Sequence, residues 1–531
     1  MIKKLLGLFL ILIILQAHAQ QKLTSGGKLK PEQAIMDVRH YTIALDVDPK
    51  QKSIEGYTTI SVIMSEPTHV LLFDLLDSLN VSKVLVNGKT ENFEHKNDMV
   101  RISMPAELPA GRAEVKVIYG GKPHVAVHPP WDDGFIWTTD STGHPWIAIT
   151  AEGTGGKLYF PCKDHPSDEP NEGVDMFITV PQGLVVAGPG LLKNVAKHGD
   201  KATYHWQTKY TINNYSIIFN AGDYKVVTRP YTTVDGHNVP IQFYVLNEHA
   251  DKAEHLLDIF VKTIHEQEKY FGEYPWAKEK IGLVETPHLG MEHQTMVAYG
   301  NKFRYTKVGG EDYDGLMHHE FGHEWWGNKV TAKDWADYWI HEGINTYADA
   351  LYVREFEGER AYINLFKRTA LGLQNKIPVV MGKDIDEEAA YNSDIYGKGA
   401  FFMHTICYIM GDSLFFPAIK KFVTSPQYTY DNLVNTDDVQ QFFSKESGMD
   451  MKPLFDLYLR TTEKLQVHVK TMAGDKYLIS LANITMPLPM DVRTDAGIKR
   501  VLVTSKGIVV NSKTQPIIDE DTYYLKAVTY E

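Results

Sequence analysis

The hydrophobic pattern of this chain changes its period twice, and this limits the possible folds more strongly than any other feature. Between residues 41 and 227 apolar and polar residues alternate, as at Ile43, Leu45 and Val47, which is typical of strands with one buried face. From about residue 251 to 459 the apolar residues follow helical spacing, and strand-like patterns return after that. We therefore predict an α+β multidomain protein.

The two changes of period also place the domain boundaries. We expect a β-rich, sandwich-like domain in residues 20–228, a mainly helical domain in residues 229–462 and a small β-sandwich in residues 463–531. The chain has 531 residues, which is long enough for three domains with ordinary hydrophobic cores.

Charge and cysteine content exclude several functions. The chain has 54 basic and 67 acidic residues, a formal net charge of -13 and no basic cluster, so nucleic-acid binding is not expected. Its two cysteines, Cys162 and Cys407, cannot form a disulfide framework or a thiolate zinc cluster. They could pair in an oxidising compartment, but two buried thiols are the expectation. Any bound metal must use histidine and carboxylate ligands.

The N-terminus has the pattern of a secretory signal peptide. Lys3 and Lys4 precede the apolar run of residues 5–15, and residues 17–19 then read Ala-His-Ala, which predicts cleavage after Ala19. The run is about half as long as a membrane span requires, so a retained anchor is the weaker alternative. We expect an exported protein, periplasmic or secreted, without a membrane anchor after cleavage.

One motif predicts a metal site. His319 and His323 flank Glu320 in an HExxH pattern, and a helix would bring both imidazoles to one face. Alone the pattern could be a pair of surface histidines. Glu342 follows His323 after 18 intervening residues, so a second helix could supply a third ligand. Two imidazoles, one carboxylate and an open fourth position are typical of a catalytic zinc, here one Zn²⁺ per chain.

This ligand set indicates hydrolysis without a covalent intermediate. Zinc lowers the pKa of a bound water and polarises a carbonyl oxygen. Glu320 is not needed as a ligand, so it can act as the general base and pass the proton to the leaving amine. A hydrogen-bond donor to the oxyanion is also expected, but with 29 tyrosines in the chain spacing alone does not identify it.

Together with Gly343 and Tyr347, these residues resemble the aminopeptidase N family of gluzincin peptidases, which includes leukotriene hydrolase. The resemblance covers nearly the whole chain after residue 19 and implies a thermolysin-like, mainly α catalytic domain. The family's Gly-x-Met-Glu-Asn motif is matched by residues 289–293, Leu-Gly-Met-Glu-His. The resemblance implies that Glu292 binds the substrate's α-amine and that Gly290, Met291 and His293 line the substrate.

Two further motifs carry family roles onto this chain. Residues 160–162, Phe-Pro-Cys, resemble a landmark of the family's β-domain, and the second amine-binding residue lies nine positions before the proline, at Glu152. Residues 396–399, Tyr-Gly-Lys-Gly, resemble the segment with the transition-state tyrosine, which implies that role for Tyr396. On the residues alone, Glu152 would be a solvated loop carboxylate, Glu292 a buried ion-pair partner and Tyr396 an ordinary aromatic residue.

Three positions depart from the family pattern. His293 replaces the usual Asn and Leu289 the usual Gly, which alters the edge beside the substrate. His341 replaces the Asn that often precedes the third ligand and could change the hydrogen bonds around the metal. Longer relatives carry a large C-terminal helical domain, and without one the site is expected to be more open.

These observations predict an exported zinc aminopeptidase whose partners are peptides with a free N-terminal amine. Two alternatives remain at this stage: a zinc hydrolase of a non-peptide substrate, like leukotriene hydrolase, and a catalytically silent peptide-binding scaffold. Intact ligands and an intact base disfavour the scaffold. No motif fixes the residues that would contact the first side chain of a substrate, and none indicates an oligomeric state.

Overall fold

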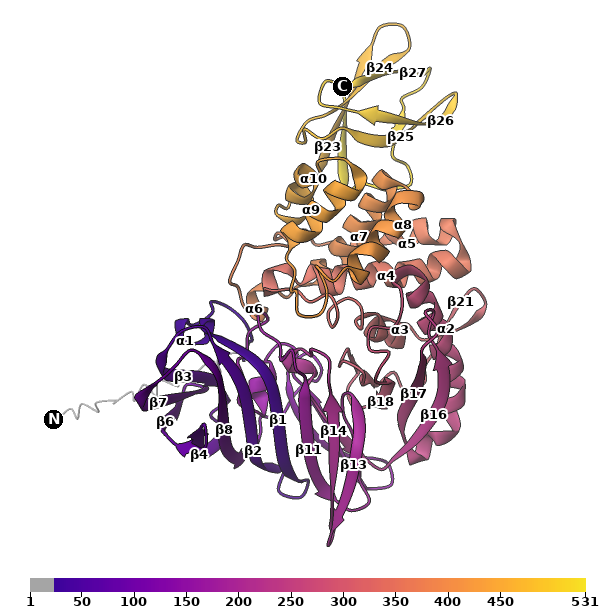
Figure 1. Cartoon of the computed structure of the whole chain (residues 1–531). Helices are drawn as coiled ribbons and strands as arrows, with labels where there is room; N and C mark the ends of the chain where they lie inside the picture. The colour runs from indigo at the N-terminus through magenta and orange to yellow at the C-terminus, as the bar shows by residue number, and fades with distance from the viewer. Residues whose placement is uncertain (1–22) are drawn as a thin grey trace, which may run out of the picture.

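A computed structural model describes residues 23–531 of the chain, so the proposed signal peptide lies outside the described residues. The described residues form three parts that follow one another along the sequence (Figure 1). A β-rich part lies at the bottom of the view, a helical part in the middle and a small β part at the top. No helix among the described residues combines the length and apolar character needed to cross a membrane.

The N-terminal part is built on an eight-stranded sheet with the strand order β13-β14-β11-β1-β2-β8-β4-β5. Buried and partly exposed residues alternate along its strands, so one face packs on the core, as the sequence pattern predicted. The strands are β1 Met36–Asp48, β2 Ser53–Met64, β4 Leu79–Val86, β5 Lys89–Thr90, β8 Gly111–Gly121, β11 Val174–Pro181, β13 Leu191–His198 and β14 Lys201–Thr208.

Two smaller sheets complete this part and share its core. One contains β3 Thr68–Asp74, β7 Met99–Leu108 and β6 Asn92–Lys96; the other contains β12 Val185–Ala187, β15 Asn220–Gly222, β10 Pro145–Thr150 and β9 Gly134–Thr139. The short helix α1 (Pro31–Ala34) precedes the first strand. The core contains Cys162, which is a buried free thiol like Cys407, in agreement with the prediction of two unpaired cysteines.

The middle part begins with a mixed five-stranded sheet that precedes the helices. Its strands are β16 Tyr224–Thr232, β17 Asn238–Leu246, β18 Ile281–Glu285, β20 Val297–Tyr299 and β19 Gly290–Met291. Between β17 and β18 lies helix α2 (Ala253–Phe271), which buries Leu257, Phe260 and Ile264 on one face. The predicted change to helical spacing at residue 251 therefore corresponds to the start of α2.

The remaining helices surround the HExxH segment. They are α3 Gly315–Gly322, α4 Trp339–Glu357, α5 Glu359–Gly372, α6 Glu387–Ala390, α7 Ser393–Met410, α8 Asp412–Thr424, α9 Thr436–Ser447 and α10 Lys452–Leu459, after a hairpin of β21 Thr306–Val308 and β22 Glu311–Tyr313. Helices α4 and α7 approach closely at two glycines. A Cβ atom on Gly343 would lie 2.7 Å from the Cα atom of Gly399, so neither position has room for a side chain.

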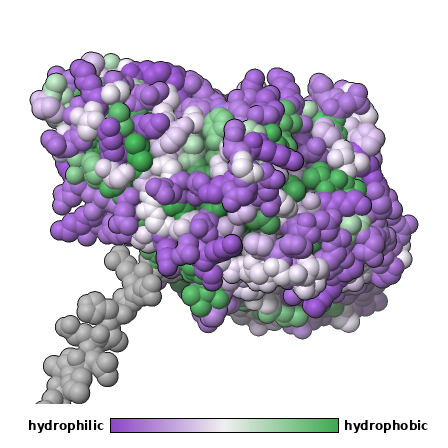
Figure 2. All heavy atoms as spheres, turned by 90° about the horizontal axis from the view of Figure 1, so that it is seen from below, coloured by the Kyte–Doolittle hydropathy of each residue, from purple (hydrophilic) through white to green (hydrophobic). Residues whose placement is uncertain are grey.

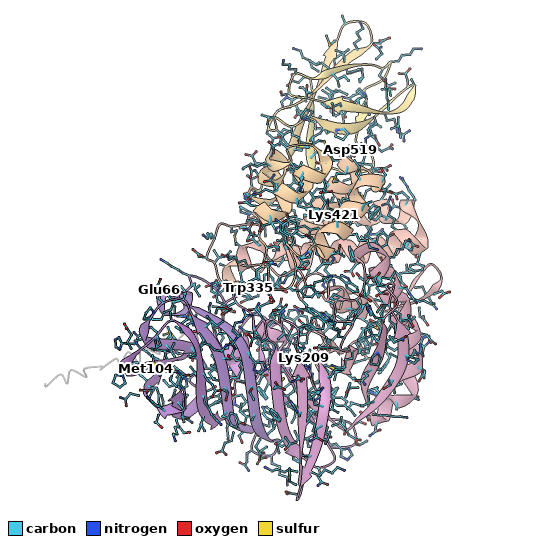
Figure 3. The ribbon with its side chains drawn as sticks, in the orientation of Figure 1. Glu66, Met104, Lys209, Trp335, Lys421 and Asp519 are labelled. Atoms are coloured by element: carbon cyan, nitrogen blue, oxygen red, sulfur yellow. The ribbon has the colours of Figure 1, made fainter. Side chains whose placement is uncertain are left out.

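The C-terminal part consists of two small sheets. One contains β27 Ile508–Asn511, β24 Lys476–Leu481, β23 Leu465–Met472 and β29 Lys526–Tyr530; the other contains β26 Gly497–Val503, β25 Leu488–Thr494 and β28 Ile517–Ile518. Its apolar residues belong to the same core as those of the helices. Asp519 is buried in the C-terminal part and pairs with Lys526 at 2.8 Å (Figure 3). The predicted small β-sandwich is therefore joined to the helices by a continuous apolar core.

Residues 24–27 connect the first two parts, and we call them the N-terminal strap. The backbone N–H of Ser25 donates to the carbonyl oxygen of Gly153 at 2.6 Å, in the β-rich part. The carbonyl oxygen of Ser25 accepts from the N–H of Glu387 at 3.1 Å, in the helical part. Trp335, labelled at the junction in Figure 3, packs against Gly26 of the strap. The strap therefore holds the loop after Glu152 beside the start of α6.

Candidate metal centre and substrate cavity

Helices α3 and α4 bring the three predicted metal ligands together. His319 lies on α3, His323 caps its C-terminal end, and Glu342 lies in the first turn of α4. Oε2 of Glu342 is 3.4 Å from Nε2 of His319 and 3.4 Å from Nε2 of His323. One ligand atom from each side chain fits within 4.8 Å of the other two, so the group could hold a metal ion.

The other ring nitrogens of both histidines are already engaged. Nδ1 of His319 lies 2.7 Å from Oδ2 of Asp349, and Nδ1 of His323 lies 2.7 Å from the carbonyl oxygen of Trp326. Such partners fix the ring orientation and leave Nε2 as the ligand atom. Oε2 of Glu342 is buried and has no hydrogen-bond partner among the described residues. Two imidazoles and one carboxylate of this kind suit zinc.

Asp349 links the first histidine ligand to a second buried histidine. Its Oδ1 is 2.7 Å from Nδ1 of His318, whose Nε2 is 3.0 Å from Oε2 of Glu266 on α2. Burial alone would raise the pKa of Asp349, but the charge of His319 and the hydrogen bonds from both histidines lower it to about 2. Asp349 is therefore a stable anion behind the ligand group.

The predicted base lies beside this group. Glu320 is buried next to the two histidines, and burial raises its pKa to about 8. The backbone of β19 passes close over it, because a Cβ atom on Gly290 would lie 2.6 Å from Oε1 of Glu320. Gly290 and Met291 thus form an edge strand directly beside the base.

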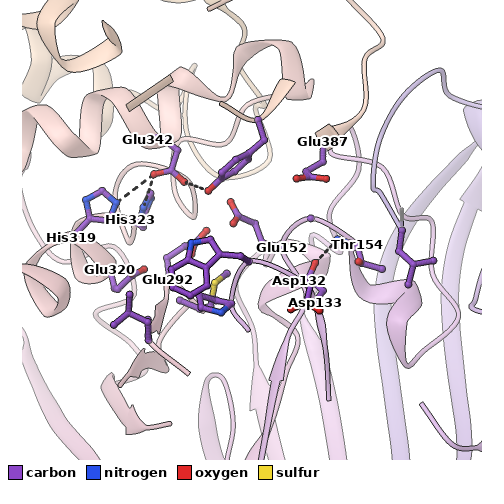
Figure 4. A pocket seen from close by; sticks show the side chains of 18 of the residues that line it. Asp132, Asp133, Glu152, Thr154, Glu292, His319, Glu320, His323, Glu342 and Glu387 are labelled. Atoms are coloured by element: carbon purple, nitrogen blue, oxygen red, sulfur yellow. Dashed lines mark hydrogen bonds and ion pairs between the residues drawn. The ribbon is translucent and has the colours of Figure 1, made fainter. Parts of the chain in front are cut away.

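A cavity of about 680 Å³ opens in front of these residues, and Figure 4 shows its labelled side chains. The β-rich part, Leu23, β19 and the helices all contribute to its walls. Among the described residues its lining contains no lysine or arginine, while acidic groups are numerous. The residues that line it are Leu23, His124, Val127, Pro130, Trp131, Asp132, Asp133, Glu152, Gly153, Thr154, Leu289, Gly290, Met291, Glu292, His319, Glu320, His323, Glu342, Glu387, Tyr391 and Tyr396.

Both predicted amine-binding glutamates line this cavity. Glu292 is 4% exposed and follows β19, whereas Glu152 extends from the loop after β10 (Figure 4). Burial raises the pKa of Glu152, and the charge of Glu292 raises it further. Oε1 of Glu152 is buried without a hydrogen-bond partner among the described residues. Two such carboxylates are suited to bind a protonated amine.

Tyr396 also lines the cavity, on the first turn of α7. Its hydroxyl contacts that of Tyr391, and the Tyr391 hydroxyl donates to Oε1 of Glu342 at 3.4 Å. The Tyr396 ring stacks beside that of His319, with 6.2 Å between ring centroids. The hydroxyl-bearing face of α7 is thus held next to the ligand group, where a hydrogen-bond donor could meet an oxyanion.

Three departures from the family pattern have different surroundings. His293 is completely buried and is not part of the cavity wall, so the structure does not bring it to the other predicted substrate-binding residues. Nε2 of His341 accepts the N–H of Ala332 at 2.8 Å and thereby holds the loop after α3. Leu289 is 42% exposed at the cavity rim.

Sequence reasoning missed several residues of the site. Asp349 lies seven positions after Glu342, two helical turns along the same face, and this spacing is a signal that could have identified it. Tyr391 directly precedes Asn392, the N-cap of α7, which is a weaker signal. Asp133 and Glu387 have no motif, because only the tertiary fold brings their segments to the cavity.

Comparisons with known proteins agree with this geometry. Residues 255–458 match the model of the peptidase family M1 domain. Aminopeptidase M1-B of Oryza sativa subsp. japonica is 22% identical over 473 residues, which cover 82% of this chain and 51% of the relative. Tricorn protease-interacting factor F2 of Thermoplasma acidophilum is 23% identical over 455 residues, covering 80% of this chain and 54% of the relative. The chain spans about half the length of these curated relatives.

Solved structures show the same fold. A mutant M1 zinc metallopeptidase of Deinococcus radiodurans, bound to a Tyr-Ser-Ala substrate, superposes with a TM-score of 0.67 at 22% identity. The match covers 82% of this chain and 95% of that chain. The predicted arrangement of a β-rich domain, a helical catalytic domain and a small β-domain is therefore confirmed.

Proposed function

Because the chain carries a peptidase family M1 domain in residues 255–458, we propose that it is a zinc-dependent aminopeptidase that removes N-terminal residues from peptides. One observation supports this most strongly: the ligand group, the base Glu320 and the amine-binding pair Glu152 and Glu292 all line one cavity. A protein that only bound peptides would not need a base beside a metal group.

Different residues of the chain have different roles in hydrolysis. His319, His323 and Glu342 would hold the zinc ion, which when bound supplies Lewis-acid polarisation of the scissile carbonyl and activates a water nucleophile. The Glu320 carboxylate takes a proton from the attacking water and returns it to the leaving amine. The Tyr396 hydroxyl donates a hydrogen bond to the developing oxyanion.

Glu152 and Glu292 restrict the reaction to the first peptide bond. They bind the protonated α-amine, and hydrogen bonds between charged partners are about twice as strong as neutral ones. A blocked or internal residue would leave both buried carboxylates without a cation, which is costly. By binding the amine, the pair places the carbonyl of the first residue, and no other, in the position of the scissile carbonyl.

A matched pair of substrates tests this function. Incubate the protein with aminoacyl-naphthylamides and with their N-acetylated forms, with and without a chelator and with zinc restored afterwards. We expect hydrolysis of the free-amine substrates only, abolished by the chelator and recovered with zinc. Equal turnover of blocked and free substrates would rule out the aminopeptidase, and hydrolysis that resists the chelator would rule out the metal mechanism.

We also propose that the protein acts outside the cytoplasm, in a periplasm or in the surrounding medium. The support is the lysine pair, the apolar run and the Ala-His-Ala sequence at residues 17–19. N-terminal sequencing of the protein recovered from a secreting host should begin at Gln20. Recovery of a chain that still begins at Met1 would contradict export by this route.

A further inference from the structure

Leu289 is an exposed apolar side chain close to the reacting groups, and the proposed reaction gives it no role. It is 42% exposed and lines the cavity, one residue before the edge strand β19. Hydrophobic residues are scattered between hydrophilic ones elsewhere on the surface (Figure 2), so exposure alone does not mark a site. The position of Leu289 relative to the base and the amine-binding pair is what distinguishes it.

The backbone around Leu289 is held by its neighbours. A Cβ atom on Gly300 would collide with the carbonyl oxygens of His288 and Leu289, so the two backbone segments are in direct contact. The hydroxyl of Thr286 also donates to the carbonyl oxygen of His288 at 3.1 Å. Immediately after Leu289, β19 pairs with β20. The exposed leucine side chain therefore extends from a backbone segment that is fixed on both sides.

The order of residues along this segment matches the order of groups along a peptide substrate. Glu292 follows β19 and binds the α-amine in the proposed function, whereas the base Glu320 lies directly under Gly290. Leu289 is the next residue beyond Gly290, on the side away from Glu292. The direction from Glu292 to Leu289 is thus the direction from the amine, past the scissile carbonyl, to the leaving part of the substrate.

The edge strand supports an extended substrate in this direction. β19 is the last strand of its sheet and also lines the cavity, so a peptide can lie along it with the opposite chain direction. Both chains advance by about 3.3 Å per residue when they are extended. One residue beyond the scissile carbonyl on the substrate therefore corresponds to one residue beyond Gly290 on the protein, which is Leu289.

The chemistry of this position favours an apolar partner. A leucine that is partly open to water in the free protein loses that exposure when an apolar side chain packs on it, which is favourable. A polar side chain in the same place would give up hydrogen bonds to water without gaining any from leucine. Met291 and Val127 add further apolar groups to the cavity lining.

We propose that Leu289 contacts the side chain of the substrate's second residue, directly after the scissile bond, and so makes the enzyme prefer peptides with an apolar residue there. This inference rests on the proposed function, because that function places the amine at Glu152 and Glu292 and the scissile carbonyl at the metal group. The rival assignment is a contact between Leu289 and the first side chain of the substrate.

Tripeptides that differ only in their second residue provide the test. Compare kcat/KM for Ala-Leu-Ala, Ala-Asn-Ala and Ala-Gly-Ala in the zinc-loaded natural protein, since leucine and asparagine are similar in size but differ in polarity. The leucine peptide should exceed the asparagine peptide by about tenfold, the lower end of the discrimination that apolar contacts provide. In Leu289→Ala and Leu289→Asn this ratio should fall to about threefold or less, while hydrolysis of Ala-Gly-Ala persists.

The matched control is Leu371→Ala on α5, which removes a leucine side chain that is 88% exposed and outside the cavity lining. This variant should keep the natural ratio. A ratio near one in the natural protein, or an unchanged ratio in both Leu289 variants, would overturn the proposal. An equal loss for all three peptides in those variants would overturn it too, because it would indicate a purely structural role.

The peptides Leu-Gly-Ala and Asn-Gly-Ala separate the rival assignment, because they carry the same two side chains at the first position. Their kcat/KM ratio should be the same in the natural protein and in the Leu289 variants. If the variants change this ratio and leave the ratio for the second position unchanged, Leu289 contacts the first side chain and the proposal is wrong.

The two proposals fail in different ways. If no peptide with a free amine is hydrolysed, the aminopeptidase function is wrong. If the three peptides that differ in their second residue are hydrolysed equally fast, the function holds and only the preference at the second position is wrong.

Discussion

The two ends of the cavity use the same residue types with opposite electrostatic outcomes. At the metal end, Glu342 and Asp349 lie between histidines, and although burial opposes it, the imidazole charges lower the pKa of both carboxyls. At the opposite end, burial and the charge of Glu387 raise the pKa of Asp133 to about 7. The comparison teaches that burial alone does not determine the state of a carboxylate; its partners do. Histidines lower the pKa at one end, whereas burial and a neighbouring carboxylate raise it at the other.

The largest effect is expected for Glu320, the proposed base beside the metal ligands. Glu320→Ala should lower kcat by about 10²–10⁴-fold, because general-base catalysis is lost, while the three metal ligands stay intact. Activity assays and metal analysis of the same sample check this. Full activity in the variant would refute the role of Glu320, and loss of zinc would show that the base and the metal end are not independent.

Tyr396→Phe should follow, with kcat reduced by about 10²–10³-fold and KM little changed, because the oxyanion loses a donor. Tyr391→Phe is its matched control, since it removes the hydroxyl that contacts both Tyr396 and Glu342. We expect a smaller loss there. A larger loss in Tyr391→Phe would mean that Tyr391, rather than Tyr396, meets the oxyanion. Steady-state kinetics of the two variants separate these outcomes.

Asp349→Asn tests how strongly zinc binding depends on the negative charge of Asp349. The amide cannot balance the charge of His319 and His318, so zinc affinity should fall by about 10–100-fold. Chelator competition measures this without reference to activity. Glu355→Gln, on the same helix but paired with Lys269 at the surface, should leave zinc affinity unchanged. Unchanged affinity in Asp349→Asn would contradict the proposed support.

The smallest effect is expected at Asp133, and it concerns stability. The folded-state pKa of Asp133, about 7, lies above the ordinary carboxyl value, so its stabilising contribution is fully present below about pH 4 and is lost as pH rises through about 7. Asp133→Asn should therefore melt a few degrees higher than the natural protein at pH 8, with a smaller difference or none at pH 5. Calorimetry at both values checks the sign. An equal difference at both pH values would show that the carboxyl does not titrate in this range.

Sequence reasoning worked where one local segment carries the information. The alternation in β1 and the helical spacing of α2 follow from a single buried face, and His319, Glu320 and His323 lie within five residues. It did not find Asp133 and Glu387, which are 254 positions apart (387 − 133). Their proximity depends on the strap and on the loop at Gly153, and no periodic pattern describes such contacts.

The motif at residues 289–293 shows a second kind of limit. Gly290, Met291 and Glu292 line the cavity, whereas the next side chain, His293, is completely buried outside its wall. A motif specifies the position of the backbone, but packing around each residue decides where a side chain goes. The neighbours of His293 come from the tertiary fold and cannot be derived from the five-residue motif.

The contact between Gly343 and Gly399 has a consequence for how this site can vary. Gly343 directly follows the ligand Glu342, and Gly399 lies three residues after Tyr396, so the place where α4 and α7 touch sets the spacing between ligand and tyrosine. With only backbone at the contact, that spacing has reached its lower limit. Any substitution at either glycine can only widen it. Substitutions at these glycines can therefore increase the distance between Glu342 and Tyr396 but cannot decrease it.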